Sequence, residues 1–437
     1  MKLHIENFAK IANADIEING ITVIAGENNT GKSTVGKVLY SLFDSFYNIT
    51  SRVDNQRKMS VRGIIDDLGY YDPEKDDYEF FINTQLTDFD DMYEELLHNI
   101  KQIHDKKLLA SSVQKILQVY SHANFNVRKD EFIDCVNKII DVFSIADDQI
   151  RKNLVLRTFN TEFNNDFYTK LNNNADSYIY LNIKSQSIEL NFKQTSNGAS
   201  VEQINRFLPL NSQIVYLDNP GVIDQLDNQF RFRFSRNRNH EDNLIRKLQI
   251  ENHQNIVEET LMQYHITDIK DKITDIIHGS FVVDDKKLKF KEEGFASAHT
   301  IGNLSTGVKS FAILLRLLDN GYINKNACII LDEPEVHLHP KWQLKYAELL
   351  VMLQKQLDLH VLINSHSPYF ISAIEEYSKE YNIQDKCNYY LADLKSNVAC
   401  FKNVNKSTGE IYDKLAEPFD ELDRLMSKHN KLNGEIF

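Results

Sequence analysis

The most constraining feature of the 437-residue chain is the segment GENNTGKST at residues 26–34, which follows the apolar run ITVIA. The spacing G-x-x-x-x-G-K-S is the phosphate-loop pattern. It lies where that pattern requires, between a predicted strand and a helix predicted to begin near Gly31. In such a loop, backbone amides and the N-terminus of the helix hold phosphate oxygens. The segment therefore predicts an α/β fold with a nucleotide site.

Each part of this loop has an expected role. Lys32 is predicted to lie against the β- and γ-phosphates of ATP, and the Ser33 hydroxyl is predicted to ligate Mg²⁺. ATP and Mg²⁺ are therefore the predicted cofactors. The other residues predicted to bind the nucleotide are Gly26, Asn28, Asn29, Thr30, Gly31 and Thr34. A chance turn that contains Gly-Lys-Ser is disfavoured, because it explains neither the strand before the loop nor the helix after it.

A second apolar run ends in two acids. Residues 328–331 read CIIL and are followed by Asp332 and Glu333. In a parallel sheet, ligands collect outside the carboxyl ends of the strands, so these acids are expected beside the phosphate loop. Asp332 is predicted to hold Mg²⁺, and Glu333 is predicted to orient and polarise the attacking water. The alternative, acids that cap the next helix, would explain one carboxylate without requiring two.

Composition narrows the classes of function. The net charge of −13 makes the surface as a whole repel nucleic acids and acidic membranes, so any nucleic-acid contact needs a local basic patch. No apolar run approaches the roughly 18 residues of a membrane span, and the N-terminus lacks a signal-peptide pattern, so we expect a cytoplasmic protein. The four cysteines show no C-x-x-C pairing, which argues against a zinc site and a disulfide framework.

The order of predicted elements indicates one α/β domain split by an insertion. Strands are expected at 21–25 and near 328–331, and the alternation of strands and helices toward the C-terminus indicates a parallel sheet covered by helices. Residues 1–50 and 176–437 are predicted to form one ATPase domain with a mixed sheet. Residues 51–175 are predicted to be a helical insertion, because apolar residues recur on one helical face there. No heptad repeat is sustained, so a long coiled coil is not expected.

Three later motifs follow the phosphate loop. They are LSTG at residues 304–307, LDEPEVHLHP at 331–340 and NSHSP at 364–368. Together with the loop they resemble the ATP-binding-cassette class of ATPases, and within it the soluble branch that includes RecF, SMC-type and overcoming-lysogenization-defect ATPases. The chain most resembles the "AAA family" ATPases of bacterial anti-phage systems such as Septu and certain retrons. The motifs lie toward the two ends of the chain.

The resemblance implies further site residues. In this class the Leu-Ser-x-Gly segment contacts ATP bound to the opposite subunit, so Ser305, Thr306 and Gly307 are expected to bind a neighbour's nucleotide at the N-terminus of a helix. His366 matches the switch histidine of the class, which hydrogen-bonds the γ-phosphate or the water. A plain helix cap at Ser305 and a surface histidine at His366 are the alternatives. The implied assembly is a head-to-tail homodimer, or a higher oligomer, that sandwiches two ATP molecules.

One stretch of the chain is concentrated in basic residues. Arg231, Arg233, Arg236 and Arg238 are interleaved with phenylalanines, a combination that grips phosphate backbones and stacks on bases. Nucleic acid is therefore one expected partner. The alternatives are a solvated strand or loop, or an intramolecular partner for the acidic segment 66–95.

The resemblance also bears on what the ATPase drives. The segment after His366 shows no recognisable Asp-x-Asp nuclease centre. A separately encoded effector, a nuclease or a toxin, is therefore expected to act with a sensor or regulatory ATPase in anti-phage defence. A RecF- or SMC-like DNA-binding ATPase in DNA repair or maintenance is one alternative. A nucleotide-locked scaffold with little hydrolysis is another.

Overall fold

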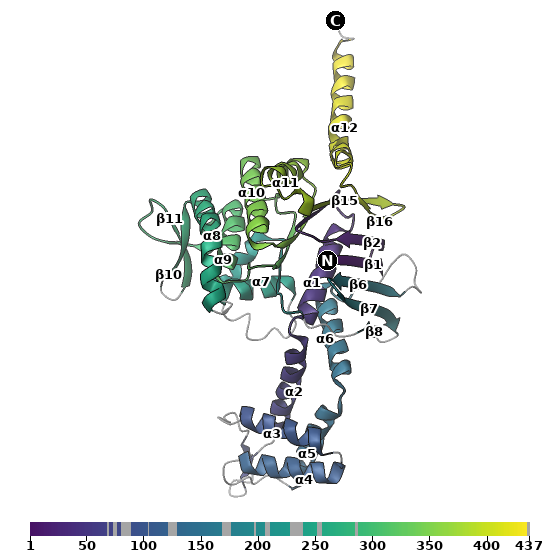
Figure 1. The fold of residues 1–437 in the computed structure, drawn as a ribbon, viewed down its shortest axis with the longest axis vertical. Helices are drawn as coiled ribbons and strands as arrows, with labels where there is room; N and C mark the ends of the chain where they lie inside the picture. Colours follow the sequence, from purple (N-terminus) through teal and green to yellow (C-terminus); the bar gives the residue numbers. More distant parts are fainter. Residues whose placement is uncertain are drawn as a thin grey trace. The chain divides into compact units, whose positions relative to one another are not determined.

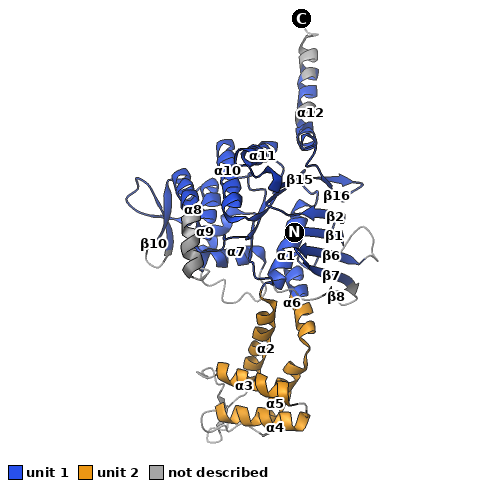
Figure 2. Ribbon diagram, in the orientation of Figure 1, with its two compact units in different colours: residues 1–47, 155–437 blue, residues 48–154 orange. Residues whose placement is uncertain are grey.

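A computed structural model gives the fold of the chain (Figure 1). It describes residues 1–67, 70–72, 77–79, 89–103, 105–120, 129–167, 176–195, 198–205, 210–227, 239–250, 256–284 and 287–434. The chain divides into two compact units, one formed by residues 1–47 with 155–437 and the other by residues 48–154 (Figure 2).

The larger unit is built on an 11-stranded mixed sheet in the order β8-β7-β6-β1-β2-β16-β15-β3-β14-β13-β9. The run from β15 to β9 is parallel throughout, whereas β1, β2, β6, β7 and β8 pair antiparallel with one another. β16 joins the two parts, parallel to β2 and antiparallel to β15. The strands are β1 (Lys2–Phe8), β2 (Ile11–Glu17), β3 (Ile21–Gly26), β6 (Ser177–Ile183), β7 (Gln186–Thr195), β8 (Gly198–Asn205), β9 (Ile214–Leu217), β13 (Cys328–Asp332), β14 (His360–Ser365), β15 (Cys387–Lys395) and β16 (Val398–Asn403).

Helices cover both faces of the parallel strands. Cys328 and Ile330 of β13 pack into a core shared with α1, while Ile329 and Leu331 pack into a second core shared with α9, α10 and α11. Burial of both faces explains why β3 and β13 are unbroken apolar runs rather than alternating ones. The helices of this unit are α1 (Lys32–Phe46), η1 (Pro220–Asp227), α7 (His240–Gln249), α8 (Ile256–Ile277), η3 (Ile301–Asn303), α9 (Thr306–Asp319), α10 (Pro340–Leu357), α11 (Pro368–Glu380), η4 (Gln384–Lys386) and α12 (Gly409–Gly434).

A small three-stranded sheet completes the described elements of this unit. It contains β10 (Gly279–Asp284), β11 (Lys287–Glu292) and β12 (His299–Thr300). β10 and β11 pair antiparallel, and the side chain of Phe290 is buried in the same core as α8 and α9.

The smaller unit, residues 48–154, is mainly helical and has a core of its own. Its elements are α2 (Ile49–Asp66), β4 (Tyr70–Asp72), β5 (Asp77–Glu79), α3 (Phe89–Gln102), α4 (Lys106–Tyr120), α5 (Lys129–Ser144) and the first part of α6 (Asp147–Glu162). Met92 and Leu96 of α3 pack with Val136 and Ile139 of α5 in this core. These residues carry the apolar periodicity that predicted helices in this part of the sequence.

The division of the chain differs from the expected insertion, 51–175, mainly at its second boundary. The unit ends at Leu154, within α6, and residues from Val155 onward belong to the larger unit. Phe159 and Phe167 are buried against Phe8 of β1 and Phe192 of β7, with the rings of Phe8 and Phe167 stacked at 5.4 Å. Aromatic packing therefore holds this segment on the antiparallel part of the sheet.

The predicted fold class, an α/β fold with a mixed sheet, is confirmed. The strand, loop and helix at the N-terminus and the alternation of strands and helices after β13 are as expected. Among the residues that the structure describes, no helix is both long enough and apolar enough to cross a membrane.

Candidate nucleotide site

Three adjacent parallel strands bring the predicted site residues to one edge of the sheet. β3, β14 and β13 end in Gly26, Ser365 and Asp332. Their ends are level, because Asn364 of β14 pairs with Asp332. Since β14 lies between β3 and β13, His366 emerges between the phosphate loop and the two acids.

The phosphate loop requires glycine at both ends. A Cβ on Gly26 would lie 2.3 Å from the carbonyl oxygen of Ala392, and Gly31 has a φ of +87°, which favours glycine. Gly31 is also the N-cap of α1, so the loop ends on the amides of a helix N-terminus. In the first turn of α1, Ser33 is exposed and Thr34 is half-buried. The backbone can therefore approach an anion closely here.

Hydrogen bonds hold the middle of the loop. Thr30 is buried, and its hydroxyl donates to the carbonyl oxygen of Glu27 at 2.8 Å. Asn29 has a φ of +67°, and its Oδ1 accepts a hydrogen bond from Nζ of Lys10 at 2.6 Å. Asn28 and Asn29 are exposed. The turn is thus preorganised by its own side chains and by Lys10, and the side chains of Asn28 and Asn29 stay exposed.

Lys32 is the buried cation of the loop. Its Nζ donates to the carbonyl oxygens of Gly26 at 2.8 Å and Glu27 at 2.7 Å, and the residue is only 4% exposed. Burial lowers the pKa of Lys32, and the carboxylates of Glu333 and Asp332 oppose that effect. Because its hydrogen bonds go to neutral carbonyls, the ammonium charge is available to a phosphate anion.

Two neighbours orient Asp332 at the end of β13. The Tyr216 hydroxyl donates to Oδ2 at 2.9 Å, and the Asn364 amide donates to Oδ1 at 3.0 Å. Burial, together with the carboxylates of Asp332 and Asp218, raises the pKa of Tyr216, so its hydroxyl keeps the proton that it donates. Each carboxylate oxygen retains a lone pair beyond these bonds, which suits Mg²⁺ or its water ligands.

Glu333 adopts a backbone conformation that is rare for its residue type. Its φ is +52°, and its N–H donates to the carbonyl oxygen of Asn364 at 2.8 Å. Such left-handed conformations are costly for residues other than glycine and gather at functional sites. The side chain is 33% exposed, and its Oε1 lies 3.4 Å from Nδ1 of His366. The turn therefore aims one carboxylate away from the strand toward the histidine.

Glu335 braces the segment that carries His366. Its Oε1 accepts hydrogen bonds from the Ser365 hydroxyl at 2.7 Å and from the N–H groups of His366 at 3.0 Å and Ser367 at 3.2 Å. Burial raises the pKa of Glu335, and these hydrogen bonds oppose the increase. Its Oε2 is buried and has no hydrogen-bond partner among the described residues. Glu335 thus positions the end of β14 and keeps one polar atom uncommitted.

The LSTG segment is held differently. Ser305 is exposed and caps α9, with its Oγ accepting from the Val308 N–H at 3.4 Å. Thr306 is half-buried and Gly307 is buried, and a Cβ on Gly307 would lie 3.0 Å from the Trp342 indole. Within the described part of the chain, no hydrogen bond or ion pair joins this segment to the phosphate loop or the acids. The chain thus assembles the loop, the acids and His366, but not the LSTG segment.

Lys309, two residues beyond Gly307 in α9, bonds to other residues of this chain. It is 6% exposed, and its Nζ donates to Oδ2 of Asp224 at 2.8 Å and to the carbonyl oxygen of Gly302 at 3.2 Å. Asp224 belongs to η1, which follows β9. The buried ammonium therefore ties the start of α9 to the segment that leaves the edge of the sheet.

Sequence reasoning missed three positioning residues, namely Tyr216, Asn364 and Glu335. Tyr216 lies in the apolar strand IVYL, and Asn364 follows the apolar run VLI in HVLINS; both carry groups that need hydrogen-bond partners when buried. That signal marks them as polar core residues but not as partners of Asp332. The basic residues Arg231, Arg233, Arg236 and Arg238 lie outside the described residues.

The residues at this edge fit ATP with Mg²⁺. The two loop glycines leave room for phosphates, and Lys32 supplies a positive charge. Asp332 presents oriented oxygens at the same edge of the sheet, and Ser33 is exposed in the first turn of α1. Together with the sheet order, these features define a P-loop ATPase fold.

Comparison with known proteins agrees with this class. The chain belongs to the AAA ATPase domain family, whose model matches residues 1–371. The family implies ATP and a divalent metal ion as ligands. None of the curated proteins compared with the chain matches it.

Among solved structures, the chain is similar to heads of SMC proteins. The SMC head domain from Thermotoga maritima is 11% identical with a TM-score of 0.38, and the match covers 92% of this chain and 98% of that one. An SMC head bound to the C-winged helix domain of ScpA is 13% identical with a TM-score of 0.43, covering 94% and 98%. An SMC head with an extended coiled coil, bound to the C-terminal domain of ScpA derived from Pyrococcus furiosus, is 11% identical with a TM-score of 0.40, covering 95% and 98%.

Proposed function

We propose that this chain binds ATP with Mg²⁺ and hydrolyses it in a site completed by a second copy. The observation that carries the proposal is the convergence of Lys32, Asp332, Glu333 and His366 at one edge of the sheet. The strained turn at Glu333 supports a catalytic rather than a capping role for that acid.

Each residue has a distinct task in the proposed reaction. Bound ATP with Mg²⁺ would supply a phosphoryl group that water accepts. Lys32 and the loop amides hold phosphate oxygens, and Ser33 and Asp332 hold the metal ion. Glu333 orients and polarises the water, and His366, 3.4 Å from its carboxylate, hydrogen-bonds the water or the γ-phosphate. Tyr216 and Asn364 keep Asp332 in its orientation.

The second copy contributes the LSTG segment. Ser305 is exposed at the N-terminus of α9, where a helix favours an anion, and no described contact ties it to this chain's own loop. Ser305, Thr306 and the Gly307 amide would bind the nucleotide held by the neighbour's loop. Binding of ATP would then close a head-to-tail dimer, and hydrolysis would open it.

Replacement of Glu333 by glutamine tests hydrolysis. The variant keeps the size of the side chain but loses the carboxylate, so kcat should fall by about 10²–10⁴. Nucleotide binding, measured with a fluorescent ATP analogue, should persist, and the dimer should accumulate in gel filtration with ATP. Glu376→Gln, an exposed acid on α11, is the matched control and should leave kcat unchanged. Equal activity of the Glu333 variant and the control would refute the catalytic assignment.

We further propose that the ATPase regulates a separately encoded effector, a nuclease or a toxin, in anti-phage defence. The motif resemblance supports this role. In a phage-infection assay, the chain expressed with the gene adjacent to its own should reduce plaque numbers, and Glu333→Gln should abolish that protection. Protection retained by Glu333→Gln would instead favour a nucleotide-locked scaffold, and no protection with sensitivity to DNA damage in a deletion strain would favour DNA maintenance.

A further inference from the structure

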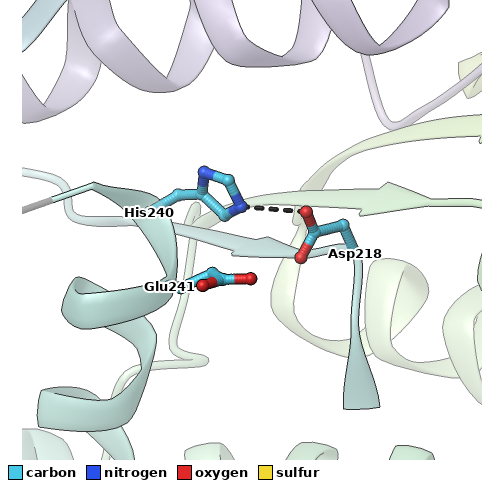
Figure 3. Close-up of side chains that lie close together, drawn as sticks. All are labelled: Asp218, His240 and Glu241. Carbon is cyan, nitrogen blue, oxygen red and sulfur yellow. Dashed lines mark hydrogen bonds and ion pairs between the residues drawn. The ribbon is translucent and has the colours of Figure 1, made fainter. Parts of the chain in front are cut away.

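A second cluster of polar residues lies at the end of β9, apart from the residues assigned above. It joins Asp218, directly after β9, with His240 and Glu241 in the first turn of α7 (Figure 3). One ligand atom from each of the three residues lies within 4.8 Å of the other two. Nε2 of His240 is 2.9 Å from Oδ2 of Asp218, and the His240 side chain is only 6% exposed. A nitrogen and two carboxylates thus converge.

Glu162 of α6 fixes the direction of the imidazole from behind. Its Oε1 lies 2.6 Å from Nδ1 of His240, and its Oε2 accepts from the His240 backbone N–H at 3.0 Å. Glu162 itself is 1% exposed in its side chain. Glu162 thus bonds one ring nitrogen of His240, and the other ring nitrogen faces Asp218. Metal-bound histidines commonly have this arrangement, in which an outer-shell carboxylate bonds the nitrogen that does not bind the metal ion.

The charges at this cluster also favour a divalent cation. Glu162, Asp218 and Glu241 bring three negative charges, and Lys37, whose Nζ is 3.7 Å from Glu162, brings one positive charge. If His240 is neutral, these four side chains carry a net charge of −2, and a divalent cation brings the local charge to zero. Buried charge is costly unless it is compensated, so the cluster gains most from an ion of that valence.

We propose that Nε2 of His240 and the carboxylates of Asp218 and Glu241 bind one divalent transition-metal ion, Zn²⁺ or Mn²⁺. One nitrogen and two oxygen ligands suit these ions, whereas Mg²⁺ prefers oxygen ligands alone. This ion is distinct from the Mg²⁺ expected at Asp332.

The site would stiffen the edge of the ATPase sheet. The ring of Tyr216 lies 4.5 Å from that of His240, and its hydroxyl donates to Asp332. A metal ion that joins Asp218 to α7 would hold His240 against Tyr216 and so limit the motion of the Asp332 partner. This role is structural and does not depend on ATP hydrolysis.

The alternative to a bound metal ion is a protonated His240, in which a proton on Nε2 takes the place of the ion. Burial lowers the pKa of His240, but its hydrogen bonds to Asp218 and Glu162 outweigh burial and raise the pKa to about 9. In that case the ring pairs with both carboxylates and no metal ion is held. The experiment below separates these two states by measuring bound metal directly.

The full chain is stripped of metal ions with a chelator. It is then titrated by calorimetry with ZnCl₂ and, separately, with MnCl₂, in the absence of nucleotide and in the presence of excess Mg²⁺. We expect one equivalent of Zn²⁺ or Mn²⁺ to bind. Glu241→Gln should weaken binding by at least roughly 10-fold. Asp242→Asn is the matched control, because Asp242 lies in the same helical turn but outside the cluster, and it should bind as the wild type does. Substitution with Co²⁺ should give visible d–d bands that Glu241→Gln alters.

Two outcomes would overturn the proposal. One is no binding of either ion above the level of a nonspecific surface site. The other is equal affinity in the wild type and Glu241→Gln. His240→Gln, checked for folding by circular dichroism, should also lose the bound equivalent. If it fails to fold, Glu241→Gln still decides, because Glu241 is only half-buried.

Discussion

The phosphate-loop half and the LSTG half of the proposed site are built in opposite ways. In the first, polar groups converge within one chain: Lys32 on the loop carbonyls, Asp332 between Tyr216 and Asn364, and Glu333 beside His366. In the second, Ser305 is exposed. The LSTG segment is held in place by the close approach of Gly307 to Trp342 and by the bond from Lys309, two residues further along α9, to Asp224.

The difference indicates which half awaits a partner. The first half has its hydrogen bonds arranged around a place for phosphates and a metal ion, so it needs a ligand. The second half is held by its own contacts but presents a helix N-terminus that, among the described residues, makes no hydrogen bond or ion pair with this chain's own phosphate loop or acids, so it fits a ligand held by another chain. We interpret the two as complementary parts of one composite site.

Apart from Glu333→Gln, the largest effect is expected at Lys32. Replacement by methionine keeps the buried volume similar but removes the charge that faces the phosphates, so kcat/KM for ATP should fall by roughly 10²–10³. The melting temperature without nucleotide should change little, since only two carbonyl contacts are lost. Steady-state kinetics and differential scanning fluorimetry measure both quantities. A fall in stability with unchanged kcat/KM would show that Lys32 is structural.

Tyr216→Phe tests whether the first half depends on its positioning residues. It removes one hydroxyl that donates to Asp332 and leaves the ring in place. The Mg²⁺ concentration for half-maximal ATPase activity should rise about 10-fold, because outer-shell partners tune metal affinity to that extent. Tyr40→Phe, a neighbouring buried tyrosine that does not bond Asp332, is the control. Equal Mg²⁺ dependence in the two variants would contradict this assignment.

Lys309→Met tests the mounting of the second half. It leaves Asp224 without its ammonium, and because Asp224 stays partly solvated the free energy of unfolding should fall by about 1–2 kcal/mol. Urea denaturation measures this change. The affinity of the chain's own loop for ATP should not change. Unaltered stability with weaker ATP binding would show that Lys309 acts on the nucleotide instead.

The smallest change in stability is expected at Ser305. Ser305→Ala removes a helix cap and should cost about 1 kcal/mol or less, as should Ser367→Ala at the cap of α11. If Ser305 also binds a neighbour's ATP, Ser305→Ala should form less dimer with ATP than the wild type does, and the small loss of folding stability should not account for the difference. Sedimentation with ATP compares the wild type with Ser305→Ala. Equal dimer fractions would leave Ser305 as a cap alone.

The sequence predicted the elements that follow from local pattern. The loop spacing, the apolar strands and the acids after β13 are consecutive residues, so their arrangement can be read directly. The partners of Asp332 could not be predicted, because Tyr216 and Asn364 reach it only through the pairing of β9 and β14 with β13. The end of the insertion was also hidden, since α6 is one continuous helix and its second part joins the larger unit through tertiary contacts, namely packing of Phe159 against Phe8 and the bonds of Glu162 to His240.

The most direct test of the composite site mixes two inactive chains. Lys32→Met disables the loop half, and Ser305→Arg, at an exposed position, blocks the second half. In a mixed dimer one site combines both defects and the other combines two intact halves. Random pairing of equal amounts should therefore restore about a quarter of the wild-type ATPase activity. No recovery, although cross-linking shows that mixed dimers form, would mean that each chain completes its own site and would contradict the account.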